Sequence, residues 1–383
     1  MAQTAATPSI GYRTKPALRS PSARWRAWAS IVGLALVVKL LIVLAALVAS
    51  GRAADPATTV LLQWRQWDAS HYLYLAGHGY ATSGDLRNLI AFFPLYPAAI
   101  ALLGLAGVPL AVGALAISNA GSLVAAVLLY EIARLDSDEA AAFRAAALFV
   151  LFPTAYFLFN GYSEGLFCAL AFGSVLAARY GRWLPAGGLG ALAAASRVTG
   201  IALLPFLLVE MATLPMTRSQ RRRALAGAAL VPLGLLSYLA VNWWVLDDAM
   251  AFVDVQRRHW FHWLSAPWTG AIEATRWLAN RDPWLRLTVG AGELLGAAVA
   301  YAVSLLSWIR LRPSDATYAL VVTVLVTFLP FWLSIPRYLL ALYPLFVLAG
   351  RVRVAVVQGV VAVASLAALV MLSIAFTRGQ WAF

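Results

Sequence analysis

The sequence predicts an all-α polytopic membrane protein. Of its 383 residues, 62% are hydrophobic and only 12% are charged, and a soluble domain cannot bury that much apolar surface. Apolar runs long enough to cross a bilayer recur along the chain, and short arginine clusters separate them. The basic side chains responsible for the net charge of +13 lie mainly between these runs. This pattern is typical of the positive-inside rule, which sets membrane topology. Nucleic-acid binding is therefore not expected.

A basic tail and a single transmembrane domain account for the whole chain. Residues 1–30 are polar and carry five basic side chains, so we expect a cytoplasmic tail. Residues 31–383 form the transmembrane domain, and its first apolar run, 31–50, is long enough for one bilayer crossing. Lys39 interrupts this run. It either faces protein or extends to the membrane surface, and a functional role is the alternative.

The remaining spans follow from the apolar lengths and the charge breaks. They are expected at residues 111–133, 141–159, 164–180, 184–196, 200–214, 225–246, 287–309, 317–334, 338–350 and 354–376. With the first run they give about eleven transmembrane helices. Threaded from an inside N-terminus, this order places every short arginine-rich loop on one side of the membrane.

Two long loops are expected on the opposite, outer side. The first, residues 51–109, contains WRQWDASHYLYLAGHGY (64–80) and AFFPLYP (91–97). Two prolines three residues apart argue against a regular span there. We therefore expect a helix at 89–105 that lies at, or dips into, the membrane interface. The second loop, residues 247–286, carries Arg257, Arg258, His259, His262 and five tryptophans.

The first outer loop contains the strongest candidate for a catalytic group, Asp68. It follows Trp67 and precedes a segment that is predicted to form a helix. One interpretation is a helix N-cap that accepts backbone N–H bonds. The other is a general base, because a carboxylate among indoles and imidazoles at a lipid surface is partly desolvated. His71 lies on the same helical face and could orient the base, bond a phosphate, or simply bond to backbone.

Three further charged residues stand in short turns on the outer side. Arg197 interrupts AAASRVTGIALLP, and Arg337 interrupts SIPRYLLALYPLF. A guanidinium binds phosphate oxygens with two parallel hydrogen bonds, so the two arginines could converge on one phosphate; contact with lipid headgroups is the alternative. Glu164, which begins a span, is either an acid favoured by the helix dipole or a second acid facing an acceptor.

Metal and nucleotide chemistry have weaker support. Asp68 and His71 could supply two metal ligands, and Glu164 or Asp85 could approach them in space, but no third or fourth ligand is evident in the sequence. We therefore expect no cofactor and no metal, with a metal site as the alternative. Cys168 is the single cysteine, which excludes a disulfide framework within the chain. No glycine-rich phosphate loop of the nucleotide-binding type occurs.

Several motifs in chain order resemble one known family. They are WDASHYLYLAGHGY, AFFPLYP, LFPTAYFLFNGYSEGLF, ASRVTG and PRYLLALYPLF, and they are similar to those of the PIG-V type mannosyltransferases (GPI mannosyltransferase 2 family) and their bacterial relatives. The resemblance implies a GT-C glycosyltransferase fold with interfacial helices in the first outer loop. It also implies a polyprenyl-phosphate sugar donor, usually mannose, and a catalytic base at the aspartate of the WD motif, here Asp68.

Residues and resemblance together predict an inverting mannosyltransferase. Asp68 deprotonates an acceptor hydroxyl, whose oxygen displaces phosphate from the anomeric carbon. The donor phosphate is expected to bind Arg197, Arg337 and His71. Further substrate contacts are expected from Trp67, Tyr72, Glu164, Arg258 and His259, and the aromatic loop at 260–268 could cover the site.

The expected partners are polyprenyl-phosphate-mannose, membrane lipid and a glycan or glycolipid acceptor whose identity stays open. The alanine- and arginine-rich composition is typical of bacteria. We therefore expect a multi-pass protein of the bacterial plasma membrane with an extracytoplasmic active site. A transporter or flippase for a lipid-linked sugar is the competing class, although no internal repeat is visible. A non-catalytic assembly subunit would leave the WD segment unexplained.

Overall fold

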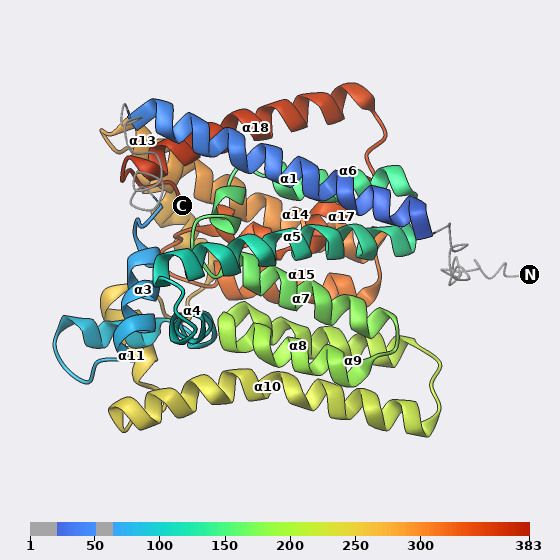
Figure 1. The fold of residues 1–383 in the computed structure, drawn as a ribbon, viewed down its shortest axis with the longest axis horizontal. Coiled ribbons are helices and arrows are strands. Elements are labelled where there is room, and N and C mark those ends of the chain that lie inside the picture. Colours follow the sequence, from blue (N-terminus) through green and yellow to red (C-terminus); the bar gives the residue numbers. More distant parts are fainter. Residues whose placement is uncertain (1–20, 51–63) are drawn as a thin grey trace, which may run out of the picture.

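A bundle of helices makes up the protein in the computed structural model, which describes residues 21–50 and 64–383 (Figure 1). Most of the predicted N-terminal tail, residues 1–20, lies outside the described residues. No strand occurs in the described part. The predicted all-α class is therefore confirmed.

The elements of the N-terminal half alternate long helices with short ones. In chain order they are α1 (Pro21–Ser50), α3 (Asp68–His78), η1 (Asp85–Ala91), α4 (Leu95–Leu105), α5 (Leu110–Asp136), α6 (Glu139–Leu151), η2 (Ala155–Leu158), α7 (Glu164–Arg179), α8 (Trp183–Ser196), η3 (Val198–Ala202) and α9 (Leu203–Thr213).

The C-terminal half continues the same pattern. Its elements are α10 (Arg218–Leu246), α11 (Ala251–His259), α12 (Pro267–Trp277), α13 (Pro283–Leu285), η4 (Arg286–Gly292), α14 (Glu293–Arg310), α15 (Pro313–Thr327), α16 (Ile335–Tyr338), η5 (Leu339–Ala341), α17 (Tyr343–Gly350) and α18 (Ala355–Thr377).

A helix stands at the position of every predicted span, but only some of these helices have the length of a span. Five stretches of the described chain are long and apolar enough to cross a membrane, namely Arg24–Ala49, Leu110–Asp136, Arg218–Leu246, Pro283–Arg310 and Ala355–Thr377. The others are short: α7, α8 and α9 have 16, 14 and 11 residues. The protein is therefore a multi-pass membrane protein, while the predicted count of about eleven spans is not confirmed.

Small residues let the short helices pack closely inside the bundle. A Cβ at Gly187 of α8 would lie 1.9 Å from the carbonyl oxygen of Gly227 in α10, and one at Gly234 would lie 1.9 Å from that of Ala191. Such contact between helix backbones is a common way for membrane helices to associate. It holds α8, and the turn that follows it, against the long helix α10.

The first outer loop contains a bent pair of helices, η1 and α4, at the position of the predicted interfacial helix. The two axes meet at 108°, as in a broken span or a re-entrant segment. The break contains Phe92, Phe93 and Pro94, and Pro94 is the N-cap of α4. The prolines therefore prevent a regular span, as predicted.

Helix α1 begins at Pro21, earlier than the predicted apolar run. The added turns are held in place by Glu131 of α5, which accepts hydrogen bonds from Arg24 Nε (2.9 Å) and Trp28 Nε1 (2.8 Å). Farther along α1, Lys39 Nζ donates to Ser122 Oγ at 3.0 Å and lies 4.6 Å from the centre of the Phe159 ring. Lys39 thus faces the protein interior, one of the two structural alternatives.

The predicted arginine-rich loops meet at one end of the bundle, on the right in Figure 1. Arg312 Nη2 pairs with Asp136 at 2.7 Å, and Arg353 pairs with Asp138 at 3.0 Å. Arg351 Nη1 donates to the carbonyl oxygen of Arg310 at 2.8 Å. The opposite end contains α3, α4 and α11 (Figure 1).

Candidate active site

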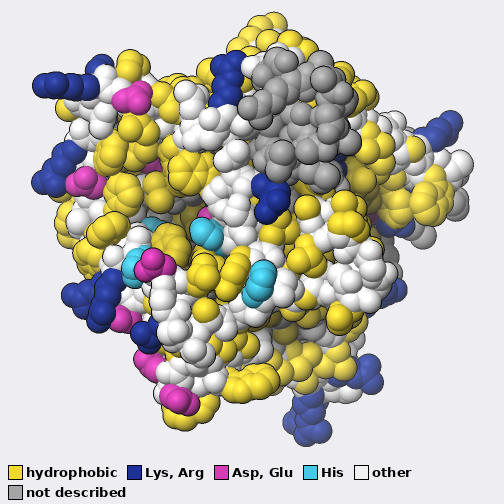
Figure 2. All heavy atoms as spheres, turned by 60° about the vertical axis from the view of Figure 1, so that its left-hand side comes forward, with side chains coloured by type: hydrophobic (Ala, Val, Ile, Leu, Met, Phe, Trp, Pro, Cys, Tyr) yellow, Lys and Arg dark blue, Asp and Glu magenta, His cyan; other side chains and the backbone are white. Residues whose placement is uncertain are grey.

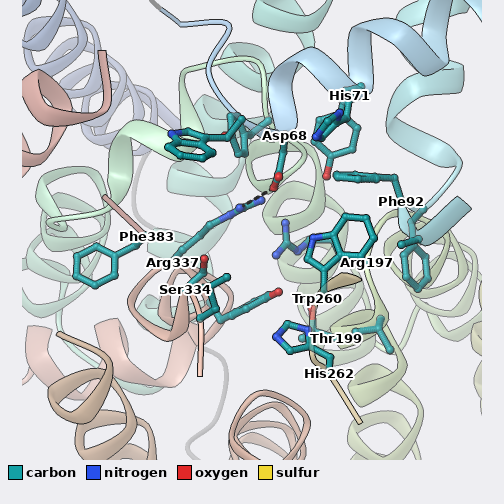
Figure 3. A pocket seen from close by; sticks show the side chains of 18 of the residues that line it. Asp68, His71, Phe92, Arg197, Thr199, Trp260, His262, Ser334, Arg337 and Phe383 are labelled. Atoms are coloured by element: carbon teal, nitrogen blue, oxygen red, sulfur yellow. Dashed lines mark hydrogen bonds and ion pairs between the residues drawn. The ribbon is translucent and has the colours of Figure 1, made fainter. Parts of the chain in front are cut away.

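Four charged side chains from four separate segments form one chain of ion pairs at the end opposite the arginine-rich loops. Asp68 Oδ2 lies 2.9 Å from Arg337 Nη1, the interaction dashed in Figure 3. Arg337 Nε and Arg197 Nη1 both donate to Glu164 Oε1. From the sequence, the two arginines could converge on one phosphate, and in the structure both donate to the same carboxylate oxygen. The formal charges of the four residues cancel.

Asp68 is the first residue of α3, and it does not cap that helix. The N-cap is Trp67, with φ 52° and no side-chain capping bond. The N-cap interpretation of Asp68 is therefore wrong, because its carboxylate points away from the helix end toward Arg337 (Figure 3). A non-glycine residue with positive φ is strained, and such strain is often found at functional sites.

A buried carboxylate that was not recognised from the sequence, Glu293, holds the turn that precedes Arg337. The backbone N–H groups of Ser334 and Ile335 donate to Glu293 of α14 at 2.6 and 2.8 Å. Ser334 has φ 71°, so the turn into α16 is also strained. The guanidinium Cζ of Arg337 then lies 4.7 Å from the ring centres of both Phe157 and Tyr162. These contacts leave Arg337 little freedom.

Glu164 lies behind the two arginines rather than in contact with the cavity. It is 3% exposed, and its Oε1 accepts from both guanidinium groups. Arg197 Nη1 also donates to Ser163 Oγ at 3.1 Å, and Tyr72 Oη lies 3.1 Å from the same hydroxyl. Burial, together with the nearby charges of Asp68 and Glu164, raises the pKa of Tyr72, so its phenol stays protonated.

We expect Glu164→Gln to destabilise the protein by about 2 kcal/mol, because the amide loses charge-assisted bonds to two buried guanidinium groups. Thermal unfolding of the purified protein in detergent measures this as a fall in the midpoint temperature. Glu273→Gln is the control, since Glu273 pairs with Arg276, which is 72% exposed. Equal midpoints for both variants would show that the buried carboxylate does not hold the arginines together.

The ion-pair chain borders a cavity of about 310 Å³. Figure 2 turns this end toward the reader and shows histidine side chains among hydrophobic ones near the middle of the face. Six of the predicted site residues line the cavity: Trp67, Asp68, His71, Tyr72, Arg197 and Arg337. Most of the predicted site is thus one physical site. His71 lies on the same rim, with its ring centre 5.3 Å from that of Phe92.

Two predicted substrate contacts, Arg258 and His259, are not among the residues that line the cavity. Arg258 Nε pairs with Asp254 at 3.0 Å and is 72% exposed. His259 Nδ1 lies 3.5 Å from Asn88 Nδ2, also at an exposed position. The cavity is lined instead by Gln256 and Trp260, which lie four residues apart and so share a face of the chain.

Other lining residues were not proposed as site residues from the sequence, although one of them, His262, lies in the aromatic loop that was expected to cover the site. They are Tyr162, Ser196, Thr199, His262, Ser334, Trp381 and Phe383, among others. Burial lowers the pKa of His262 to about 4, so its imidazole is neutral at physiological pH. No group of three or more metal-ligating side chains lies together within residues 21–50 and 64–383.

Fold and site define the class as a multi-pass helical membrane protein with a charged cavity at one end. The chain belongs to the mannosyltransferase (PIG-V) family, whose model matches residues 38–241. This match includes Asp68, Glu164 and Arg197, while Arg337 lies beyond it. The predicted family is therefore confirmed.

Curated relatives and a solved structure are similar over part of their length. The GPI alpha-1,6-mannosyltransferase 2 of Rattus norvegicus is 37% identical over 155 residues, which is 37% of this chain and 30% of that protein. The Mus musculus protein of that name is 36% identical over 171 residues, 42% of this chain and 34% of its own. This chain thus spans about a third of these relatives. An Archaeoglobus fulgidus oligosaccharyltransferase in the apo form aligns with TM-score 0.46 and 13% identity, over 91% of this chain and 56% of that one.

Proposed function

We propose that this protein is a GT-C membrane mannosyltransferase that moves a sugar from a polyprenyl-phosphate donor to an acceptor hydroxyl. The observation that carries the proposal is the chain Asp68–Arg337–Glu164–Arg197 at the cavity. It combines a carboxylate that can take a proton with two guanidinium groups that can bind a phosphate. Membership of the PIG-V family supports mannose as the sugar.

In the proposed reaction, Asp68 removes the proton from the acceptor hydroxyl. The acceptor oxygen forms a bond to the anomeric carbon of the donor while the bond from that carbon to the phosphate oxygen breaks. The leaving lipid phosphate keeps the electron pair, and the single displacement inverts the anomeric centre. The side chain of Asp68 is 28% exposed, so it is accessible from the cavity.

The arginines stabilise the negative charge that grows on the leaving phosphate. The hydrogen bonds of the Arg197 guanidinium to other described residues all come from Nη1. Its Nε and Nη2 therefore remain available for a ligand. A phosphate at Arg337 would also compete with Asp68 for that guanidinium. The carboxylate would then be released from its ion pair and could bond the acceptor hydroxyl once the donor is bound.

The positive-inside rule supports an extracytoplasmic site, because the arginine-rich loops lie at the opposite end of the bundle from the cavity. The bacterial character of the composition supports a location in the plasma membrane. In this proposal, the lipid donor enters the site from the bilayer. The lipid and the acceptor hydroxyl then meet at the outer surface.

We expect a cysteine at Ser83 to react with an impermeant thiol reagent added to intact cells, and a cysteine at Ser219 not to react. Ser83 precedes η1 near the cavity end, and Ser219 lies in the first turn of α10 at the arginine-rich end; both positions are exposed. Labelling of the protein's own cysteine should be low, because Cys168 is buried. The reverse labelling pattern would overturn the assignment of the active face.

The function is tested with purified protein, polyprenyl-phosphate-mannose and a panel of lipid and glycan acceptors. We expect transfer from the lipid donor and none from a nucleotide-mannose donor, since the expected mechanism needs a membrane-embedded phosphate carrier. Transfer from the nucleotide sugar alone would contradict the proposed donor. Movement of the intact lipid across vesicle membranes without transfer would instead support the transporter class.

A further inference from the structure

Part of the cavity wall has many buried polar atoms that lack hydrogen-bond partners. Ten such side-chain atoms occur in the described part of the chain, and five belong to residues that line this cavity: Ser196 Oγ, Thr199 Oγ1, Gln256 Oε1, His262 Nε2 and Trp381 Nε1. Burying a polar group without a partner costs roughly 1–3 kcal/mol. Their concentration in one cavity indicates a wall built to bind a polar ligand.

Two of the unpartnered residues lie apart from Asp68, whereas Trp381 packs against Trp67, the residue before Asp68. Figure 3 shows Thr199 and His262 at the edge of the cavity opposite Asp68, with Arg197 between them. Ser196 and Thr199 also flank Arg197 in the sequence, at the turn from α8 into η3. Ser196 and Thr199 are 3% and 1% exposed, so the cavity is the direction from which a ligand can reach their hydroxyls.

These groups are neutral, which restricts the chemistry of the ligand. Two hydroxyls, an amide oxygen, an indole N–H and an uncharged imidazole can each bond a hydroxyl group without a net charge. A second phosphate would instead need cations, and a lipid tail would leave these polar atoms unsatisfied. The Trp260 side chain lines the same cavity and offers an aromatic surface. Such a combination suits a sugar ring, which has hydroxyls at its edge and apolar C–H faces.

We infer that Ser196, Thr199 and His262, together with Trp260, form the subsite that recognises the sugar ring of the donor. The inference rests on the proposed function, in which Arg197 binds the donor phosphate. In a sugar phosphate the ring is attached directly to that group. The ring must therefore lie close to Arg197, where the unpartnered Ser196 and Thr199 are its neighbours in the sequence and His262 lies beside Thr199 (Figure 3).

The test compares the binding of two lipids that differ only in the sugar. Purified full-length protein in detergent is titrated with polyprenyl-phosphate-mannose and with polyprenyl phosphate, and tryptophan fluorescence reports the dissociation constants. Thr199→Val and His262→Phe each remove hydrogen-bonding atoms with little change in size. We expect each to weaken binding of the mannosyl lipid about 3- to 10-fold, the loss of one hydrogen bond, and to leave binding of polyprenyl phosphate unchanged.

Two control variants separate a binding role from a structural one. Thr199→Ser keeps the hydroxyl and should restore the wild-type preference for the mannosyl lipid. Thr288→Val removes a buried hydroxyl that bonds to the carbonyl of Trp284 at 3.0 Å and does not line the cavity, so it should bind both lipids as the wild type does.

The outcomes distinguish this inference from the proposed function. Equal weakening for both lipids, or no weakening in Thr199→Val and His262→Phe, would overturn the sugar subsite while leaving the function in place. A wild-type protein that binds neither lipid would overturn the proposed donor, and the subsite with it. If Thr288→Val also lost the preference for the mannosyl lipid over polyprenyl phosphate, the weaker binding would have a structural cause. That result would also overturn the subsite.

Discussion

Asp68→Asn is expected to lower the turnover number at saturating donor by about 10²–10⁴-fold, the usual cost of losing a general base. The amide keeps the size of the side chain but cannot take the proton of the acceptor hydroxyl. Folding should survive, because Asp68 does not cap α3, and Arg337 keeps its bond to Glu164. Donor affinity should not fall, because the base acts on the acceptor and the lost carboxylate would compete with the donor phosphate for Arg337. Initial rates and donor dissociation constants measured on the same preparation separate the two quantities.

Asp254→Asn is the matched control for this variant. Asp254 also pairs with an arginine, Arg258, at 3.0 Å, but both side chains are more than half exposed on α11. Its replacement should leave turnover unchanged, because an exposed ion pair contributes little. Near-normal turnover of Asp68→Asn would remove Asp68 from the mechanism, and loss of donor binding would assign it to the donor site instead.

Arg337→Lys is expected to lower turnover with polyprenyl-phosphate donors by roughly 10²-fold, although the charge is kept. The guanidinium joins Glu164 to Asp68 through Nε and Nη1, and the ammonium group of lysine cannot span both carboxylates with that geometry. With lysine at this position, Asp68 would no longer be held in place, and the donor phosphate would lose the planar guanidinium that binds it. Steady-state rates over a range of donor concentrations measure both effects.

Arg197→Lys should lower turnover in a similar way. In the double variant, the loss of transition-state stabilisation should be smaller than the sum of the losses in the two single variants. The reason is structural: both arginines donate to the same oxygen of Glu164, so the loss of one already disturbs the other. Strict additivity would argue that the two serve separate groups. Unchanged donor affinity and turnover in both single variants would place the phosphate site elsewhere in the cavity.

The sequence was sufficient to predict the helical membrane fold and part of the site. The apolar runs and arginine clusters predicted the helices and the end at which their basic loops meet. The WD segment and the two isolated arginines predicted residues that the structure places at one cavity. The fold prediction is confirmed because it rests on local chemistry, namely hydrophobic length and charge between spans, and the two arginines were recognisable because they interrupt turns that are otherwise small and apolar.

Other parts of the site depend on contacts between residues far apart in the chain. Glu164 was predicted to face substrate, whereas the fold places it behind the arginines as their shared partner. Glu293 holds the strained turn before Arg337 from a different helix, and only the packing of α14 against α16 brings them together. Arg258 and His259 looked suitable by type, but the helical phase of α11 turns Gln256 toward the cavity instead.

Transfer of radiolabelled mannose in membranes tests the donor and the base together without knowledge of the acceptor. Membranes from cells that produce the wild-type protein, and from cells that produce Asp68→Asn at the same level, are incubated with labelled polyprenyl-phosphate-mannose. Label is then counted in products that survive mild acid, which cleaves the sugar–phosphate bond of the donor. We expect such label with the wild-type protein and only background with the variant. Equal label in both membranes would contradict the assignment of this protein as an Asp68-dependent mannosyltransferase.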